Sequence, residues 1–235
     1  MLTVAALSWL GTAVPVDASD RDVEAQLGES YRRAGWKDVR IDLDGGIVTL
    51  KGEVPHIQAR QQIEQEAQQI SGVERVVNLV SVTRVTDDAA LQATIDREIA
   101  QSATGTVFDD VSVYVIGGTV VLVGYLTEPD KLPPLTDLIG QIDGVQQVLS
   151  EVEILPDSEF DQELRPRVAA AVYGDAAGSD SPSERAGPVH IIVRDARVSL
   201  RGTVSDEQER KKVAELVRGV AGVLSVDNRL LTEAD

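Results

Sequence analysis

The heptapeptide GIVTLKG at Gly46–Gly52 decides the fold of this 235-residue chain, because its pattern returns twice. The related stretches are GTVVLVG at Gly118–Gly124 and ARVSLRG at Ala196–Gly202. All three fit the template x-x-V-x-L-x-G, in which apolar residues alternate as in a β-strand with one buried face. Self-similarity of this kind is typical of tandem modules, so we expect one small unit repeated three times.

A second glycine, followed by valine, stands twenty residues after the last glycine of each heptapeptide. Between the two glycines, apolar residues recur at offsets of four and three, which predicts an amphipathic helix. These residues are Ile63, Ala67 and Ile70, then Leu135, Ile139 and Ile142, then Val213, Val217 and Val220. We interpret six glycines as structural, the first of each pair for strand packing and the second as a left-handed cap just past the helix: Gly52, Gly124 and Gly202, then Gly72, Gly144 and Gly222.

Two more alternating runs and one more helical stripe complete each repeat. A strand is predicted after each second glycine: Val76, Val80 and Val82; Val148, Val152 and Ile154; Val226 and Leu230. Another strand precedes each heptapeptide and joins it through a tight hairpin: Val39, Ile41 and Leu43; Val111, Val113 and Val115; Val189, Ile191 and Val193. A helix is predicted upstream of that strand: Val23, Leu27 and Tyr31; Leu91, Ile95 and Ile99; Leu164, Val168 and Val172.

The order helix, strand, strand, helix, strand predicts an α+β fold made of three tandem αββαβ modules. Because the last two strands of a module flank a helix, we expect them to run parallel. Each module is then a mixed three-stranded sheet with both helices on one face. The predicted modules are residues 20–86, 87–157 and 158–235, the last with an inserted loop at 174–188.

Residues 1–18 form a separate apolar segment before the first module. The small residues Val16 and Ala18 suit a signal-peptidase site, which favours an export signal or a membrane anchor. The stretch lacks a basic start and is short for a membrane span, which favours an arm that docks on the protein or on a neighbour.

The composition excludes several classes of protein. Without cysteine the chain has no disulfide, thiolate metal site or cysteine nucleophile. A net charge of −17 at pH 7 disfavours binding to nucleic acid, and an aromatic content of 3% argues against a large cofactor pocket. The two histidines, His56 and His190, occupy different positions of the repeat, and the sequence contains no P-loop or HExxH motif. We therefore expect a non-enzymatic protein with no metal and no cofactor.

The repeat resembles the BON domain (bacterial OsmY and nodulation) from residue 20 to the C-terminus, in three copies. The first copy carries the resemblance on these residues: Val48, Leu50, Gly52, Val54, Gly72, Val73, Val76, Asn78 and Leu79. The third copy carries it on these: Val198, Leu200, Gly202, Val204, Gly222, Val223, Val226 and Asn228. The second copy departs from the pattern at Leu126 and Ser150.

The resemblance implies an αββαβ fold and a periplasmic or outer-membrane-associated location in the envelope of Gram-negative bacteria. It also implies a role in osmotic-stress protection, envelope integrity, phospholipid binding or the chaperoning of outer-membrane proteins. One cytoplasmic member of the family binds potassium. The resemblance supplies no catalytic residues.

The three copies differ on the side of the sheet that points away from the helices. In the first copy that side carries mixed charge. In the second it is apolar, which predicts an interface: Tyr114, Val121, Val123, Tyr125 and Leu149. In the third it is basic: His190, Arg194, Arg197, Arg201 and Arg229.

Charge is divided unevenly among the copies. Residues 87–157 hold 13 acidic and 2 basic side chains, against 11 and 9 in residues 20–86 and 14 and 11 in residues 158–235. The basic side of the third copy is expected either to bind an external anion such as a phospholipid head group, or to meet the acidic second copy within one chain or between chains. Scattered surface charge is the third interpretation.

The function predicted on these grounds is that of an envelope adaptor, which binds phospholipid or outer-membrane proteins and supports envelope integrity or stress protection. The alternative is a structural protein that self-assembles, or that serves as a subunit of a larger complex, through its sheet faces.

Overall fold

The structure, a computed structural model, describes residues 18–85, 87–102, 105–174 and 188–234. The expectations for the apolar segment 1–18 and the loop 174–188 therefore fall almost wholly outside the described residues. The chain divides into two compact units, of which the first holds most of residues 1–82 and the second holds residues 83–235 together with residues 55–58. Among the described residues, no helix combines the length and the apolar character needed to cross a bilayer.

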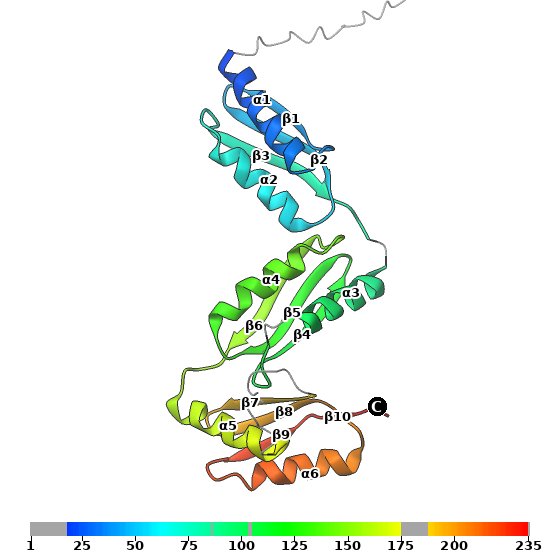
Figure 1. Ribbon diagram of the computed structural model, residues 1–235, viewed down its shortest axis with the longest axis vertical. Helices are drawn as coiled ribbons and strands as arrows, with labels where there is room; N and C mark the ends of the chain where they lie inside the picture. The colour runs from blue at the N-terminus through cyan, green and yellow to red at the C-terminus, as the bar shows by residue number, and fades with distance from the viewer. Residues whose placement is uncertain (1–17, 86, 103–104, 175–187, 235) are drawn as a thin grey trace, which may run out of the picture. The chain divides into compact units, whose positions relative to one another are not determined.

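The first module has the predicted order of elements: α1 (Ala18–Arg33), β1 (Arg40–Asp44), β2 (Ile47–Val54), α2 (Ile57–Gln69) and β3 (Arg75–Val82). Strand β2 lies at the centre of the sheet, antiparallel to β1 and parallel to β3. Both helices cover the same face of this sheet (Figure 1). Their apolar stripes meet the alternate residues of β2, so that Leu27, Ile63 and Leu50 are fully buried together.

The second module repeats this arrangement with α3 (Asp88–Gln101), β4 (Asp110–Ile116), β5 (Thr119–Leu126), a 3-10 turn η1 (Pro129–Lys131), α4 (Leu132–Gly140) and β6 (Gln147–Ile154). Strand β5 is central, antiparallel to β4 and parallel to β6. Its core is built from Ile95, Leu122 and Ile139 in the same roles as in the first module.

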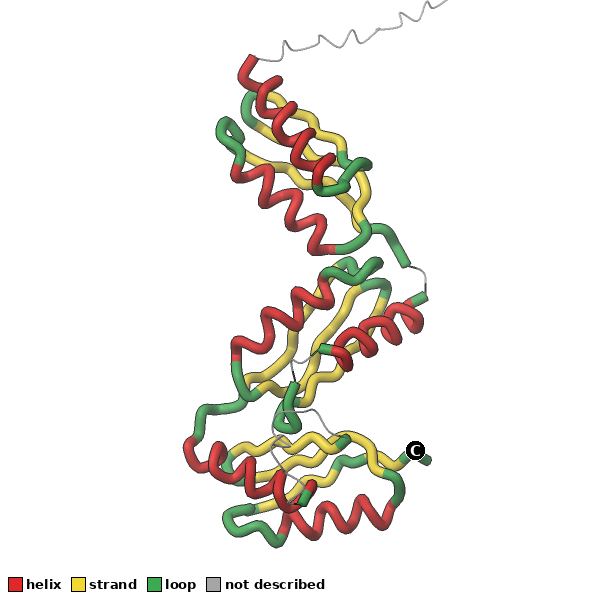
Figure 2. Tube along the Cα trace, viewed as in Figure 1, coloured by secondary structure: helices red, strands yellow, loops and turns green. Residues whose placement is uncertain are grey.

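The third module consists of α5 (Glu159–Tyr173), β7 (Val189–Arg194), β8 (Arg197–Val204), α6 (Glu207–Arg218), β9 (Ser225–Asn228) and β10 (Leu231–Thr232). Figure 2 shows the same succession of helices and strands as in the other modules. The last strand is interrupted at Arg229 and Leu230, and its two parts, β9 and β10, each pair in parallel with β8. The predicted fold of three αββαβ modules is confirmed, with this one strand divided in two.

The first glycine of each pair lies where the preceding strand crosses closely. At Gly52, where φ is +141°, an added Cβ would lie 2.2 Å from the carbonyl oxygen of Asp38. The equivalent distances are 2.0 Å at Gly124 and 2.1 Å at Gly202. A Cβ at these distances would overlap the backbone, so the framework requires glycine there.

The second glycine was predicted to cap the helix directly, but it lies in a turn that follows the helix. Helix α2 ends at Gln69, and Gly72, with φ of +96°, is the third residue of a turn closed by the Val73 amide donating to the Ile70 carbonyl. A positive φ at the third position of a four-residue turn is the geometry that favours glycine. The helices end one or two residues before the last residue of the apolar stripe, because that residue already belongs to this turn.

An acidic residue near the start of each module's first helix holds the hairpin of that module. The carboxylate of Asp20 accepts a hydrogen bond from the Gly45 amide at 3.1 Å. Asp88 accepts from the amides of Gly117 and Gly118 at 2.7 and 3.1 Å. Asp161 accepts from the amides of Asp195 and Ala196 at 2.8 and 2.9 Å. These bonds satisfy the exposed donors of the turn and join the helix to the sheet.

Candidate functional site at the junction of the second and third modules

The outer face of the second sheet is built in rows, because strand register places one residue from each strand side by side. Tyr114, Val121 and Leu149 form one such row across β4, β5 and β6. Tyr114 is 56% exposed and Leu149 is 43% exposed. Three of the five residues predicted as an apolar interface are thus neighbours on one open surface.

The same face becomes acidic toward one end of the sheet. The row after Tyr114 holds Ser112, Val123 and Glu151, and the last row holds Asp110, Tyr125 and Glu153. Tyr125, the fifth residue of the predicted apolar interface, therefore lies between two carboxylates.

Two arginines of the third module pair with the carboxylates of this row. Arg194 of β7 pairs with Glu153, and Arg201 of β8 pairs with Asp110 at 3.0 Å. The two guanidinium groups lie over the ring of Tyr125, at 5.7 Å and 5.3 Å from its centroid. Cations over an aromatic face are attracted by its electron density, so the ring reinforces both ion pairs.

The backbone and the apolar core also join the two modules. The Ile191 amide donates to the Val107 carbonyl at 2.7 Å, and Val107 and Phe108 are buried in the core of the third module. Ile192 points to the outer face of its sheet, yet it is only 4% exposed. His190 completes the contact through Nδ1, which lies against the carbonyl oxygen of Asp109.

Asp109 is a buried carboxylate at the centre of this junction, where it is 4% exposed. It accepts hydrogen bonds from the amides and hydroxyls of Thr106 and Thr127 at 2.7–2.9 Å, and from Lys131 at 2.8 Å. Burial acts to raise the pKa of Asp109, but the hydrogen bonds from Lys131, Thr127 and Thr106 together outweigh it and hold the pKa below its usual value. The site therefore keeps a negative charge that Lys131 balances.

A second buried charge, Arg165 of α5, adjoins the junction and is 8% exposed. Burial lowers its pKa, while Asp161, Asp109 and Asp157 act in the opposite direction. Within the described residues, its Nε and Nη2 atoms have no hydrogen-bond partner. Around the junction, the buried Arg165 and the half-buried Lys131 thus lie near the buried carboxylates of Asp109 and Asp161.

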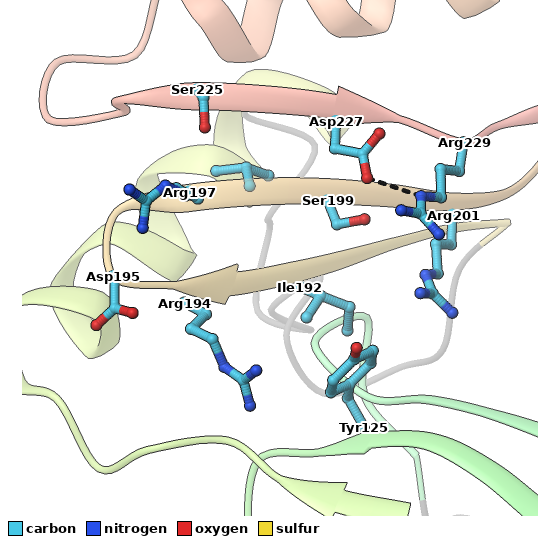
Figure 3. Close-up of a pocket in the computed structure, with 11 residues that line it drawn as sticks. Tyr125, Ile192, Arg194, Asp195, Arg197, Ser199, Arg201, Ser225, Asp227 and Arg229 are labelled. Atoms are coloured by element: carbon cyan, nitrogen blue, oxygen red, sulfur yellow. Dashed lines mark hydrogen bonds and ion pairs between the residues drawn. The ribbon is translucent and has the colours of Figure 1, made fainter.

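Beside the junction, the outer face of the third sheet and Tyr125 of the second module line a pocket of about 260 Å³ (Figure 3). Four arginines contribute to its lining: Arg194, Arg197, Arg201 and Arg229. The hydroxyls of Ser199 and Ser225 also line it. Arg229 pairs with Asp227 at 2.7 Å. Asp195 also lines the pocket, but among the residues that the structure describes no carboxylate forms an ion pair with Arg197.

The five residues predicted as a basic face therefore divide into two groups. His190, Arg194 and Arg201 contact the second module, which is the arrangement foreseen by one of the alternatives, contact with the acidic copy within one chain. Arg197 and Arg229 face the open pocket instead, and Arg194 and Arg201 also reach its edge. Described His, Asp and Glu side chains form no group of three or more suited to a metal ion.

Sequence reasoning missed the partners of these arginines. Asp109 and Asp110 were not among the predicted site residues, although Asp109 is buried and Asp110 is paired. One signal was present in the sequence, because Lys131 is one of only two basic residues in the second module. A lone lysine among many acids is a candidate partner for a buried carboxylate.

Comparisons with known proteins agree with this architecture. The model of the BON domain matches residues 19–84, 87–156 and 167–234, the third match beginning inside α5. A protein of Anaplasma centrale, described as an uncharacterized protein in the gshII 5′ region, is 28% identical over 134 residues, which cover 54% of this chain and 87% of that protein.

Two solved structures of CdsD, a structural protein of the type III secretion system of Chlamydia trachomatis, also resemble the chain. One is its C-terminal domain, which is 16% identical and covers 93% of this chain and 99% of its own, with a TM-score of 0.27. The other is also 16% identical and covers 90% and 93%, again with a TM-score of 0.27. Likeness at this level has no bearing on function.

Proposed function

Because the chain belongs to the BON domain family in three tandem copies, we propose that it is an envelope-associated binding protein without catalytic activity, whose third module binds the phosphate of an anionic phospholipid head group. BON domains indicate an envelope-associated protein. The identity of the ligand and the position of its site are proposed from the geometry of the third sheet.

The observation that carries the proposal is the position of Arg197. Arg197 is exposed at the hairpin end of the pocket, next to Ser225 on the neighbouring strand, and Figure 3 shows its guanidinium group pointing toward the hairpin. Its neighbours Arg194 and Arg201 are neutralised by Glu153 and Asp110, and Arg229 by Asp227. The carboxylate of Asp195 also lines the pocket, but no ion pair joins it to Arg197, so the guanidinium group of Arg197 is open to an external anion.

The chemistry of the pocket suits a phosphate. A guanidinium group offers parallel N–H donors that match two oxygens of a phosphate, and serine hydroxyls supply further donors. The volume of about 260 Å³ accommodates a head group and not a whole lipid. The acyl chains would stay in the bilayer, so binding is expected at a membrane surface.

The net charge of −17 opposes approach to an anionic surface, so the local site must overcome a general repulsion. Two features reduce this repulsion. The excess of acid lies in the second module, and its residues Asp110 and Glu153 are already paired with arginines. Binding is therefore expected to be modest and sensitive to salt.

Co-sedimentation with vesicles tests the proposal. The full chain is expected to pellet with phosphatidylglycerol vesicles and not with phosphatidylcholine vesicles, and Arg197→Ala is expected to abolish most of the binding. Arg218→Ala removes the same charge from the exposed end of α6, outside the pocket, and should bind as the wild type does. Absence of binding to both vesicles, together with salt-sensitive self-association, would contradict the proposal and favour a structural, self-assembling protein.

A further inference from the structure

The outer face of the second sheet is only partly covered. The third module contacts the row of Asp110, Tyr125 and Glu153, whereas Tyr114 and Leu149 lie two rows away and are exposed. In the row between these two rows, Glu151 is exposed on the edge strand β6. We call the surface made by Tyr114, Val121, Val123, Leu149 and Glu151 the open rows.

We propose that the open rows bind an extended segment of a partner protein in which basic and apolar residues alternate. The surface consists of apolar side chains beside an acidic one, and it belongs to the module with 13 acidic and 2 basic residues. An apolar surface of this kind usually marks an interface, and its acidic border selects a partner that carries positive charge. This inference concerns another module and another ligand than the head-group site.

The chain itself contains an example of what this face binds. Strand β7 presents His190, Ile192 and Arg194 on its outer face, an alternation of basic, apolar and basic residues. Against the second module, Arg194 pairs with Glu153 and Ile192 becomes buried. The open rows continue the same surface with the same chemistry, since Glu151 follows Glu153 on the face and Leu149 follows Glu151.

The geometry of strands fits such a segment. Rows on one face of a sheet lie about 6.5–7 Å apart, which is also the distance between alternate side chains of an extended chain. A partner with a basic residue at Glu151 would therefore place its next outward residue near Leu149. The exposed edge of β6 also offers unpaired backbone groups to an added strand.

The open rows are better suited to a segment of a separate protein than to a second copy of this chain. Within the part of the chain that the structure describes, β7 is the strand that presents the alternation of basic, apolar and basic residues outward, and it is already engaged in its own chain. An anionic bilayer is also disfavoured, because Glu151 and the acidic excess of the module repel it.

Fluorescence anisotropy of the full chain with labelled synthetic peptides tests the inference. One short peptide alternates lysine and valine, and its matched partner alternates glutamate and valine. The lysine peptide is expected to bind, and Leu149→Ser and Glu151→Lys are each expected to weaken binding on the order of tenfold, as the loss of one good contact does. Both side chains are exposed, so the variants should fold as the wild type does.

Two variants serve as controls and leave the open rows intact. Leu224→Ser removes a leucine that is 73% exposed in the third module, and Asp137→Lys reverses an exposed charge on α4. Both should bind the lysine peptide as tightly as the wild type. The inference is overturned if Leu149→Ser and Glu151→Lys bind equally well, if the glutamate peptide binds as tightly, or if Leu149→Ser instead abolishes a dimer seen by analytical ultracentrifugation.

Discussion

Arg201 Nη1 lies 3.0 Å from Oδ2 of Asp110, a residue 91 positions earlier in the chain and in the preceding module. The two side chains are 29% and 14% exposed, so the pair is partly shielded from water. The arginine also lies over the ring of Tyr125. This ion pair, with the one between Arg194 and Glu153, joins two modules that a repeat sequence alone would present as independent.

A double-mutant cycle on Arg201→Ala and Asp110→Ala should give a coupling of about 1 kcal/mol in the free energy of unfolding, because a partly shielded pair is worth more than a fully exposed one. Urea unfolding of the four proteins measures it. The exposed pair of Arg210 and Glu207 on α6 is the control, with an expected coupling below about 0.5 kcal/mol. Equal couplings would show that the junction contact adds nothing.

Asp109 should make stability fall on acidification. Its pKa is held below the usual value in the folded protein, so its contribution is present above the unfolded pKa of about 3.9 and is lost as the pH falls through the folded pKa. Asp109→Asn should be less stable by about 2 kcal/mol or more at pH 7, because Lys131 loses its buried partner and keeps only the exposed Glu128, at 3.8 Å. Unfolding measured from pH 7 to pH 2 should show a smaller loss for this variant than for the wild type.

The exposed Asp137 provides the comparison for that titration. Asp137→Asn should reproduce the wild-type curve over the whole pH range. A wild-type curve no steeper than that of Asp109→Asn would show that the buried carboxylate does not govern the acid transition.

Gly52→Ala should destabilise the first module by more than about 2 kcal/mol, because the added Cβ would meet the Asp38 carbonyl at a strained φ. Gly28→Ala is the matched control. Gly28 lies inside α1, and no atom lies within 4 Å of a Cβ added to it. That variant should gain about 0.5–1 kcal/mol from helix propensity. Thermal unfolding followed by circular dichroism compares them, and similar melting temperatures would refute the steric explanation.

Asp161→Ala should destabilise the third module by about 2–4 kcal/mol, because it leaves two turn amides, those of Asp195 and Ala196, without their acceptor. Asp161 is 1% exposed, so water does not readily replace the carboxylate. Glu163→Ala changes an exposed residue of the same helix and should have little effect. Hydrogen exchange of the two amides provides a direct measurement: it should accelerate in Asp161→Ala and stay slow in Glu163→Ala.

Most of the fold could be predicted from the sequence because its signals are local. Alternation in stretches such as Gly46–Gly52 specifies a strand with one buried face, and the offsets of Ile63 and Ala67 specify a helix. The end of that helix was misplaced because Ile70 is apolar and in phase, although it belongs to the following turn. Periodicity reports which side of the chain is buried, and it does not report where the backbone leaves the helix.

The candidate site could be predicted only in part. Alternation indicated which side of the third sheet carries Arg194, Arg197 and Arg201. It could not indicate that two of them are neutralised and one is left open, because that depends on how Glu153 and Asp110 of another module approach. Pairing between modules depends on packing over long sequence separations, for which a single sequence has no periodic signal.

The most direct test of the account is an NMR titration of the ¹⁵N-labelled full chain with dihexanoylphosphatidylglycerol, a soluble lipid with an anionic head group. The account predicts saturable shifts that centre on the amides of Arg197, Ser199 and Ser225, and that disappear in Arg197→Ala while persisting in Arg218→Ala. Shifts that are absent, or that are unchanged by Arg197→Ala, would contradict the assignment of the third module as the head-group site.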